Sequence, residues 1–298
     1  MRLSVIIVTW NSQRFINDCL ESVFSQQIDD MEIIVIDNGS SDNTLQILEG
    51  FTNRIILIKN QTNTGFCLAN NQAILKAQGK YIFTLNSDVI LGKGYLKSLI
   101  GCLETNKQIG MVQGKLLRFD RKTIDGLGLR LSLLMRLYNI QENKADSNKF
   151  DKPREIFGPC AAAAVYKKEL LAQIRYQDEF FDEKFFFLVE DFDLAWRARI
   201  RGWKAMYVPD AIAYHYRESS AYINKFKQYL SFRNRYFMLI KNADWRHVFM
   251  LISGLFIYEL PRFIYMLLFN KNTIKALKEI HDYLPELRKK RYKPDGFS

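Results

Sequence analysis

The chain has 298 residues, of which 48% are hydrophobic and 25% are charged, and it contains no low-complexity tract. This length and composition fit one large globular domain, or one domain with an added segment. The formal net charge of +11 is uneven, because residues 217–298 hold 16 Lys or Arg against 7 Asp or Glu. A basic C-terminal part predicts an anionic partner, either nucleic acid or a membrane surface.

Four cysteines lie far apart and form no Cys-x-x-Cys pair: Cys19, Cys67, Cys102 and Cys160. This spacing argues against a zinc site or a disulfide framework and favours buried free thiols in a reducing compartment. The apolar run at residues 5–8 is too short for the core of a signal peptide. We therefore expect a cytoplasmic chain.

Apolar, β-branched runs alternate with helical patterns in the first 90 residues. Strands are predicted at residues 3–9, 31–36, 55–58 and 81–85, and a helix follows each of the first three, with Ser12 as the N-cap of the first. This alternation predicts an α/β fold with a mostly parallel sheet and helices on both faces. The first loop lacks Gly-x-Gly-x-x-Gly, so a dinucleotide site is not expected.

Short polar side chains follow every one of these strands: Thr9 and Asn11, Asp37 and Asn38, Asn60 and Asn63, then Asn86 and Asp88. One such group could simply turn the chain. Four groups at one edge of a parallel sheet favour a polar ligand site. At the end of the central strand, Asp88 could hold a divalent cation, and the cation could hold a diphosphate.

Four motifs at these strand ends carry a resemblance to a known family: Val8-Thr9-Trp10-Asn11, Asp37-Asn38-Gly39-Ser40-Ser41-Asp42, Asn63-Thr64-Gly65-Phe66 and Leu85-Asn86-Ser87-Asp88. Together with a Gly-Pro-Cys at 158–160, an acidic stretch at 186–197 and a later histidine, the chain resembles family 2 inverting glycosyltransferases. The subgroup that it resembles most contains bacterial rhamnosyltransferases. The resemblance covers residues 3–217 and implies a GT-A (Rossmann-like) fold, a nucleotide-sugar donor and Mn²⁺ or Mg²⁺.

The resemblance also implies how the donor is held. Thr9 and Asn11 would border the nucleoside, and Asp37 would hold the pyrimidine base or the ribose. Asn63 and Gly65 would shape the donor pocket. The donor implied is a UDP- or dTDP-sugar.

The metal motif departs from the usual family form. Asn86 and Asp88 stand where the family places Asp-x-Asp, so Asn86 contributes a neutral amide, a weaker ligand than a carboxylate. His215 follows a predicted strand at a position where the family can complete its metal site, and we expect it to be a ligand. The alternative is a structural histidine. Arg217 could contact the diphosphate.

The richest chemical stretch lies at residues 180–197, where aromatic residues surround acidic ones. Glu190 and Asp191 fall at the start of a predicted helix, which could be no more than an ordinary acidic N-terminus. Displacement at an anomeric carbon, however, needs a base for the acceptor hydroxyl. By resemblance we assign that role to Asp191 and expect Glu190 and Trp196 to contact the acceptor. Asp193 and Arg197 should form an i,i+4 ion pair.

The remaining elements are less distinctive. Residues 118–152 are irregular and receive no role. A single strand rich in small residues is predicted at 156–165, and two short strands are predicted at 204–208 and 211–214.

The sequence pattern predicts helices in the last part of the chain. A helix is predicted at 219–241, and the apolar residues 248–269 are interrupted by Glu259, Pro261 and Arg262. We interpret them as one or two interfacial helices rather than a membrane span, and the basic residues 288–291 suit anionic lipid. The alternative is a helical subdomain packed on the first domain or on a second copy. Nucleic acid is not expected, because no recognition motif is present.

The sequence thus predicts a GT-A catalytic domain at residues 1–217 and a basic helical region at 218–298. The expected activity is inverting sugar transfer to a glycan or lipid-linked acceptor in polysaccharide assembly, in the cytoplasm or on the inner face of the membrane, with a homodimer as one form. A sugar-1-phosphate nucleotidyltransferase is the alternative enzyme, but it would need a Gly-rich basic first loop. A non-catalytic scaffold is the third class, and the presence of both Asp88 and Asp191 argues against it.

Overall fold

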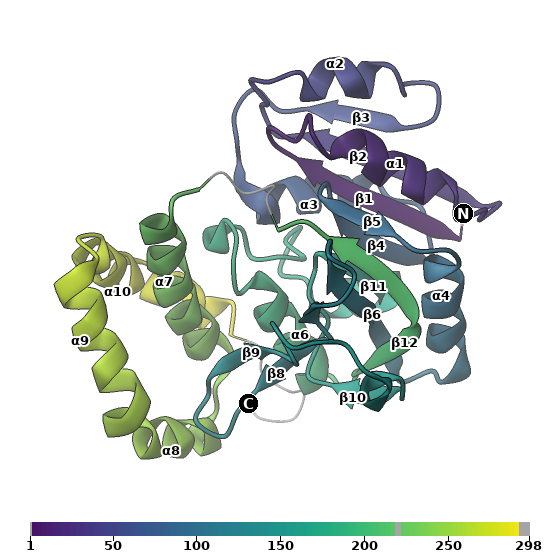
Figure 1. Ribbon diagram of the computed structural model, residues 1–298. Helices are drawn as coiled ribbons and strands as arrows, with labels where there is room; N and C mark the ends of the chain where they lie inside the picture. The colour runs from purple at the N-terminus through teal and green to yellow at the C-terminus, as the bar shows by residue number, and fades with distance from the viewer. Residues whose placement is uncertain (1, 218–221, 292–298) are drawn as a thin grey trace.

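A broad twisted sheet forms the centre of the molecule (Figure 1). The computed structural model describes residues 2–217 and 222–291, and the predicted start of a helix at 219 lies outside them. Within the described residues the sheet has ten strands, in the order β10-β12-β6-β11-β4-β1-β2-β3, with β5 paired to β12 and β7 to β6. A separate hairpin, β8-β9, lies beside it.

The strands of the central sheet are β1 (Leu3–Thr9), β2 (Met31–Asp37), β3 (Ile56–Lys59), β4 (Tyr81–Asn86), β5 (Val89–Leu91), β6 (Ile109–Arg118), β7 (Ile124–Gly126), β10 (Arg154–Ile156), β11 (Ala163–Lys167) and β12 (Lys204–His215). The hairpin strands are β8 (Leu129–Leu131) and β9 (Leu137–Asn139).

The helices of the same region are α1 (Ile16–Phe24), α2 (Thr44–Glu49), α3 (Gly65–Lys76), α4 (Tyr95–Thr105), α5 (Lys168–Ile174) and α6 (Glu190–Ile200), with 3-10 turns at Asn148–Phe150 and Glu183–Phe185. The C-terminal helices are α7 (Asn224–Asn242), α8 (Trp245–Ser253), α9 (Leu260–Phe269) and α10 (Thr273–Lys289), with a π-helical turn at Leu255–Glu259.

The first four predicted strands form the parallel part of the sheet. β1 lies between β2 and β4 and is parallel to both, and β3 continues the parallel order beyond β2. β6 and β12 are also parallel, whereas β11 runs antiparallel between β4 and β6. The sheet is therefore largely parallel, and the predicted α/β class is confirmed.

Side chains of β1 alternate between two cores, as the two-residue period of a strand requires. Leu3, Val5 and Ile7 belong to a core covered by α1, α2 and α4. Ile6 belongs to the core on the opposite face, which is covered by α3, α5 and α6. The predicted arrangement of helices on both faces is thus present.

Two local predictions were wrong. Ser12 does not cap α1, which begins at Ile16, because the Ser12 hydroxyl instead shares a hydrogen bond of 2.8 Å with the Ser87 hydroxyl. The strand predicted at 156–165 is interrupted after β10. At that point Gly158 packs so closely that an added Cβ would lie 2.2 Å from the Ala195 Cβ.

A third prediction placed a break where the structure has a continuous strand. The two strands expected at 204–208 and 211–214 form one strand, β12, which stays paired to β6. The register shifts between Val208 and Ile212, so a bulge accommodates Pro209, which has no amide hydrogen to donate.

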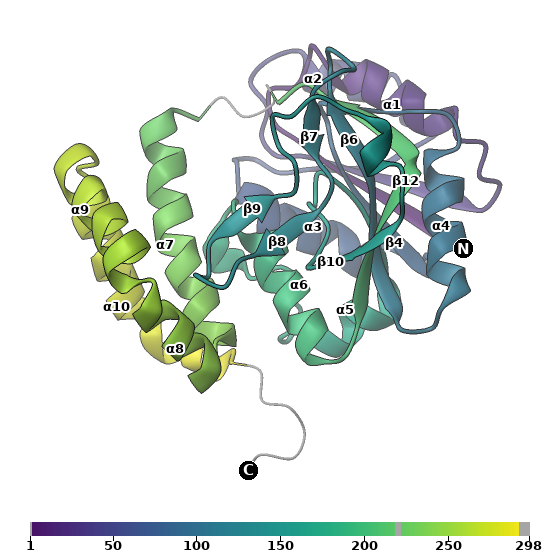
Figure 2. The same cartoon turned by 60° about the horizontal axis from the view of Figure 1, so that its bottom comes forward.

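The C-terminal helices lie together on one side of the sheet region (Figures 1 and 2). α7 is the inner helix, because it packs against both α6 and α10. Within the described residues no single helix is both apolar and long enough to cross a bilayer. In the part of the chain that the structure describes, one bent pair reaches that length and composition: α8 together with residues 255–269, across a 60° bend.

Buried ion pairs join the C-terminal helices to α6. The Lys241 ammonium, on α7, lies 2.7 Å from an Asp182 carboxylate oxygen and 2.9 Å from one of Asp193. Asp193 also pairs with Arg197 at 2.9 Å, which confirms the predicted i,i+4 pair, and Lys290 reaches Asp182 at 3.0 Å. The helical region is therefore packed on the first domain, while the boundary after residue 217 stays a prediction.

We predict that Lys241→Met destabilises the protein by about 3 kcal/mol, because it leaves two buried carboxylates with one cation fewer. Urea unfolding at pH 7 measures the change, and Lys271→Met, at an exposed position, is the control. A loss below about 1 kcal/mol would show that these ion pairs do not hold the two parts together.

Candidate functional site

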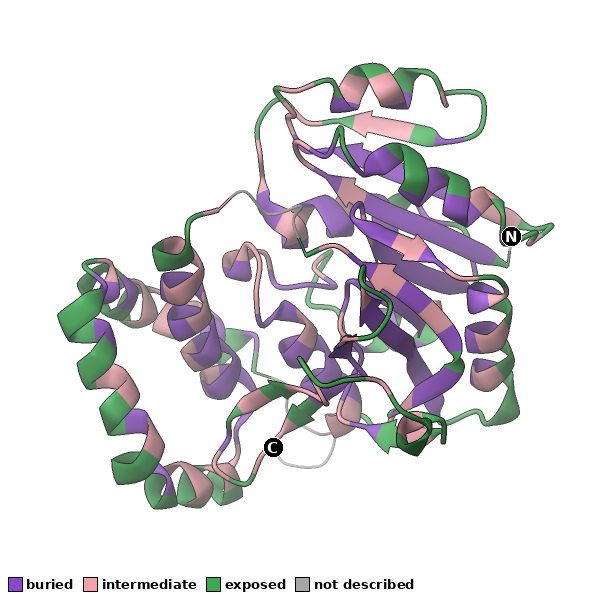
Figure 3. Cartoon of the chain, in the orientation of Figure 1, coloured by how far each residue is buried: buried purple, intermediate pink, exposed green. Residues whose placement is uncertain are grey.

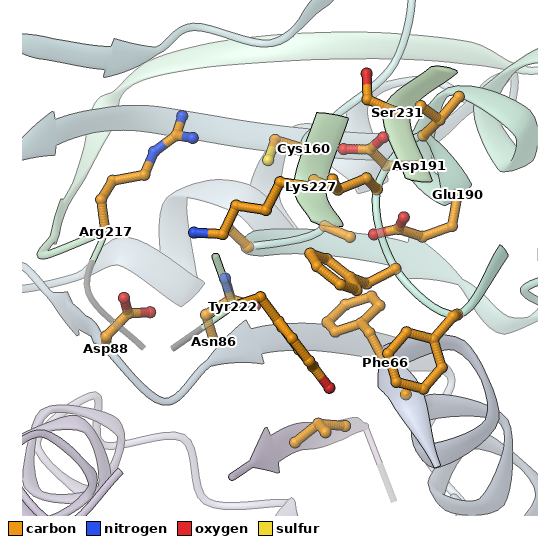
Figure 4. Close-up of a pocket in the computed structure, with 18 of the residues that line it drawn as sticks. Phe66, Asn86, Asp88, Cys160, Glu190, Asp191, Arg217, Tyr222, Lys227 and Ser231 are labelled. Atoms are coloured by element: carbon orange, nitrogen blue, oxygen red, sulfur yellow. The ribbon is translucent and has the colours of Figure 1, made fainter. Parts of the chain in front are cut away.

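A cavity of about 640 Å³ opens where β1 and β4 end, between the start of α6 and the start of α7 (Figure 4). Its lining includes seven of the residues predicted from the sequence: Asn63, Gly65, Asn86, Asp88, Glu190, Asp191 and His215. Segments far apart in the chain therefore meet at one edge of the sheet, as the polar strand ends suggested.

Four other predicted residues do not line this cavity. Thr9 is buried beneath it, and Asn11 and Asp37 bond to the loop after β2, where they accept hydrogen bonds from Ser41 and Ser40 respectively. Their contacts to a nucleoside stay predictions.

Trp196 lies away from the cavity. Its ring packs edge-on against Phe157 and His247, and the residue is only 4% exposed. The helical period places Trp196 on the core-facing side of α6, so this position does not support its assignment to the acceptor.

At one end of the cavity a histidine lies between two carboxylates. The Nε2 atom of His215 is 3.2 Å from Asp88 Oδ1, and its Nδ1 atom is 2.8 Å from Asp125 Oδ2. Burial lowers the pKa of His215, but the hydrogen bonds to Asp125 and Asp88 outweigh it and raise the pKa to about 9. The imidazole is therefore a cation at neutral pH in the absence of a metal.

Asp125 is one of the site residues that the sequence did not predict. It stands on β7 within the irregular stretch 118–152, and its second oxygen accepts a hydrogen bond of 2.6 Å from the Arg217 Nε. Burial raises the pKa of Asp125. His215 and Arg217 lower it by a larger amount, so the net pKa is below its usual range. In the sequence, the one local signal for Asp125 was a carboxylate between Ile124 and Gly126. The structure shows that both of these neighbours are buried.

Asp88 and His215 form a donor set that fits a divalent cation. Within residues 2–217 and 222–291 no three His, Cys, Asp or Glu side chains gather as a complete metal site. An ion bound mainly by a substrate diphosphate needs only one or two protein ligands. Asp125 would orient the imidazole through Nδ1, as a carboxylate beside a metal-binding histidine commonly does.

At the other end of the cavity α6 begins with two carboxylates. The amide of Phe192 donates a hydrogen bond of 2.8 Å to Asp191 Oδ1. Burial raises the pKa of Asp191 to about 6, although the Phe192 amide, the Cys160 thiol and the Ala161 amide oppose the rise. A base with this pKa is ionised at neutral pH and still basic enough to accept a proton.

Glu190 has a more apolar environment. Burial, and next the charge of Asp191, raise the pKa of Glu190 well above its usual value. Among the described residues its Oε2 atom has no hydrogen-bond partner. A protonated Glu190 would present a donor, and not a second negative charge, to a bound acceptor.

The loop before α6 is held in an uncommon conformation. Phe186, Leu188 and Val189 have positive φ angles of 65°, 70° and 74°, a region that β-branched residues such as valine rarely adopt. The Asn234 side-chain amide, on α7, donates hydrogen bonds to the carbonyls of Phe187 and Leu188 at 2.9 and 2.8 Å. α7 thus fixes the loop that leads into Glu190 and Asp191.

Aromatic rings line the side of the cavity next to Trp10 and Asn63. Tyr222 stacks on Trp10 and on Phe187, with ring centroids 5.0 Å apart in both pairs. The Asn63 side chain donates a hydrogen bond of 3.0 Å to the Tyr222 hydroxyl. These rings had no assigned role, because only the folded chain brings Tyr222 to the first strand.

α7 also closes the side of the cavity next to Asp191. Lys227, Gln228 and Ser231 line it, and Lys227 extends into the cavity (Figure 4). The predicted helical region is therefore part of the site and not only a support for it.

Solved structures of other proteins share the fold of this chain. The chain aligns with Staphylococcus aureus TarS at a TM-score of 0.60 and 20% identity, over 97% of this chain and 53% of that one. It aligns with S. aureus TarS in complex with UDP-GlcNAc at 0.58 and 20%, over 98% and 88%. A structure of GalNAc-T7 with UDP, GalNAc and Mn²⁺ gives 0.65 and 14%, over 96% and 56%. The fold is that of a GT-A glycosyltransferase.

The family follows from the sequence comparison. The family model described as Glycosyl transferase family 2 matches residues 4–175, more than half of the chain, and the chain belongs to this family. It is 33% identical over 110 residues to an uncharacterized glycosyltransferase of Haemophilus influenzae, which is 36% of this chain and 34% of that protein.

A longer match joins the chain to the poly-beta-1,6-N-acetyl-D-glucosamine synthase of Staphylococcus aureus. The two are 23% identical over 214 residues, which is 71% of this chain and 49% of the synthase. The chain thus spans between a third and a half of the length of these curated relatives. The predicted family is confirmed, and the rhamnosyltransferase subgroup stays a prediction.

We predict that Asp191→Asn stabilises the fold at alkaline pH. The carboxyl has a pKa of about 6, above its usual 3.8, so ionisation opposes folding above pH 3.8, and the penalty reaches its full size above pH 6. The variant should gain roughly 2 kcal/mol at pH 8 and less at pH 5. Urea unfolding at both pH values measures it, with Asp210→Asn, an exposed position on β12, as the control.

Proposed function

We propose that this chain is a metal-dependent, inverting glycosyltransferase that moves a hexose or deoxyhexose from a UDP- or dTDP-sugar to a glycan or lipid-linked acceptor. The observation that carries the proposal is that the two ends of one cavity hold different ionisable groups. Asp88, paired with His215, lies at one end, and Asp191, with its pKa near 6, lies at the other (Figure 4). Rhamnose is the proposed sugar, by the resemblance of the motifs.

The donor end would hold the diphosphate. Asp88 and His215 would bind Mn²⁺ or Mg²⁺, and the bound ion would neutralise the charge that develops on the leaving diphosphate. Asp125 keeps the imidazole in place through Nδ1. Asn86, which lines the cavity, can add an amide oxygen, and Arg217 can add a cation.

The acceptor end would supply the base. Asp191 would take the proton from the acceptor hydroxyl as that oxygen attacks the anomeric carbon, while the bond from that carbon to the diphosphate oxygen breaks. Attack from the side opposite the leaving group inverts the configuration. The rings of Phe187 and Phe192 line this part of the cavity and would exclude water.

Two structural neighbours support the donor and metal classes. TarS was solved with UDP-GlcNAc, and GalNAc-T7 was solved with UDP, GalNAc and Mn²⁺. The match to a poly-N-acetylglucosamine synthase supports a role in polysaccharide assembly. We also propose a cytoplasmic location, peripheral to the inner face of the membrane, where lipid-linked acceptors are held.

We predict that UDP or dTDP with Mn²⁺ raises the melting temperature, whereas GDP and CMP do not. Asp88→Asn should remove the Mn²⁺-dependent part of the rise, and the exposed control Asp210→Asn should keep it. Because Mn²⁺ must displace the proton of His215, whose pKa is about 9, the Mn²⁺-dependent rise should be larger at pH 8 than at pH 6.5. A thermal-shift panel measures all of these, and no rise with any nucleotide would favour the scaffold alternative.

We predict that Asp191→Asn lowers the turnover rate about 10³-fold while donor binding is unchanged, because an amide cannot accept the proton. The turnover of the wild type should fall as the pH drops through 6, as Asp191 becomes protonated. Release of UDP in the presence of acceptor extracts measures the rate. If the variant retained more than a tenth of the turnover, another group would be the base.

A further inference from the structure

The segment formed by α8, the π-helical turn and α9, residues 245–269, exposes a continuous run of large apolar side chains. We call it the apolar arm. Figure 3 shows α8 and α9 largely exposed at the edge of the molecule. The exposed side chains are Trp245, Val248, Phe249, Ile252, Leu255, Phe256, Ile257, Leu260, Ile264, Tyr265, Leu267, Leu268 and Phe269. A surface of this kind marks an interaction site.

Contacts between Glu259 and α7 fix the outward orientation of the arm. Glu259, in the π-helical turn, is buried, where its carboxylate pairs with Arg235 and accepts a hydrogen bond of 3.0 Å from the Tyr236 hydroxyl. The polar group of the turn therefore points to α7. Phe256 and Ile257, which are 76% and 75% exposed, point away from it.

The tip of the β8-β9 hairpin extends the same surface. A Cβ built on Gly254 would lie 3.5 Å from the Leu134 side chain, and the Arg136 guanidinium lies 4.7 Å from the Tyr258 ring centroid. Leu133, at the tip, is 77% exposed.

The charges around the arm decide between its two natural occupants, a bilayer and a second copy. Between residues 245 and 278 every exposed charged residue is a cation: Arg246 at one end, and Lys271, Lys275 and Lys278 at the other. The carboxylates that flank this range, Asp244 and Glu279, lie next to His247 and Lys275 respectively. A two-fold dimer places the same patch of both copies together, so it would bring these cations close to one another. An anionic bilayer surface is complementary to them.

We propose that the apolar arm lies in the interface of an anionic bilayer, with its exposed aliphatic and aromatic side chains among the acyl chains and Lys271, Lys275 and Lys278 at the headgroup phosphates. A helix pair bent by 60°, with one apolar side and a basic border, suits a position in the plane of the membrane.

The arm is also joined to the cavity through α7. Arg262 donates a hydrogen bond of 3.2 Å to the carbonyl of Ser231, and Ser231 lines the cavity beside Asp191. One residue of α7 thus contacts both the arm and the cavity. We infer that the acceptor is held by a lipid in the bilayer that the arm contacts, an inference that rests on the proposed transferase function.

Vesicle flotation with the full chain tests the contact with matched variants. Ile257→Asp changes an exposed isoleucine of the arm, and Ile56→Asp changes an exposed isoleucine on β3, at the far edge of the sheet. The vesicles are phosphatidylcholine alone or with phosphatidylglycerol. We expect binding to the anionic vesicles, about tenfold weaker for Ile257→Asp and unchanged for Ile56→Asp. The triple change Lys271→Glu, Lys275→Glu and Lys278→Glu should weaken binding to anionic vesicles only.

Three results would overturn the proposal: no vesicle binding by the wild type, equal effects of the two isoleucine variants, or binding insensitive to the lysine changes. A dimer that Ile257→Asp converts to a monomer, measured by light scattering, would assign the arm to a second copy. The nucleotide thermal shift of Ile257→Asp should equal that of the wild type. If vesicle binding failed but nucleotide still raised the melting temperature, the transferase proposal would stand. If vesicles bound but nucleotide gave no rise, the membrane contact would stand.

Discussion

The insertion of the Lys241 ammonium between Asp182 and Asp193 is the interaction on which the site depends. Asp193 belongs to the same helix as Asp191 and lies less than one turn after it, so the cation that holds Asp193 also fixes the start of α6. Buried charges of this kind are costly unless each is paired, and here both carboxylates are paired more than once. The C-terminal helices therefore position the carboxylate that we propose as the base.

The two ends of the cavity use carboxylates in opposite ways. Asp125 is surrounded by His215 and Arg217, which favour its ionised form. Asp191 lies in an environment where burial dominates and favours the protonated form. Environments that shift the pKa values of similar groups in opposite directions allow one group to hold charge and another to move a proton. The separation arises from packing, since the residue type is the same.

Patterns within a short window predicted most of the parallel half of the sheet and the strand-end residues Asn63, Asn86 and Asp88. The period of a strand and the turn chemistry after it are local properties, so the sequence records them directly. The bulge in β12 and the interruption at Gly158 were missed, because each depends on a neighbouring element: β6 in one case and Ala195 on α6 in the other.

The site residues that were missed share that cause. Asp125 is ordinary in sequence and becomes important only because β7 pairs with β6, next to the strand that ends in His215. Tyr222 reaches Trp10 across more than 200 residues of chain. Trp196 is the reverse case, since it was assigned to the acceptor and its ring packs away from the cavity, among core residues.

The family match ends at residue 175, and this boundary divides the cavity. Asn63, Asn86 and Asp88 lie within the matched part, whereas Asp191, Ser231 and the apolar arm lie after it. His215 and Arg217, at the same end of the cavity as Asp88, also lie after residue 175, so the pair Asp88 and His215 joins the matched part to the rest of the chain.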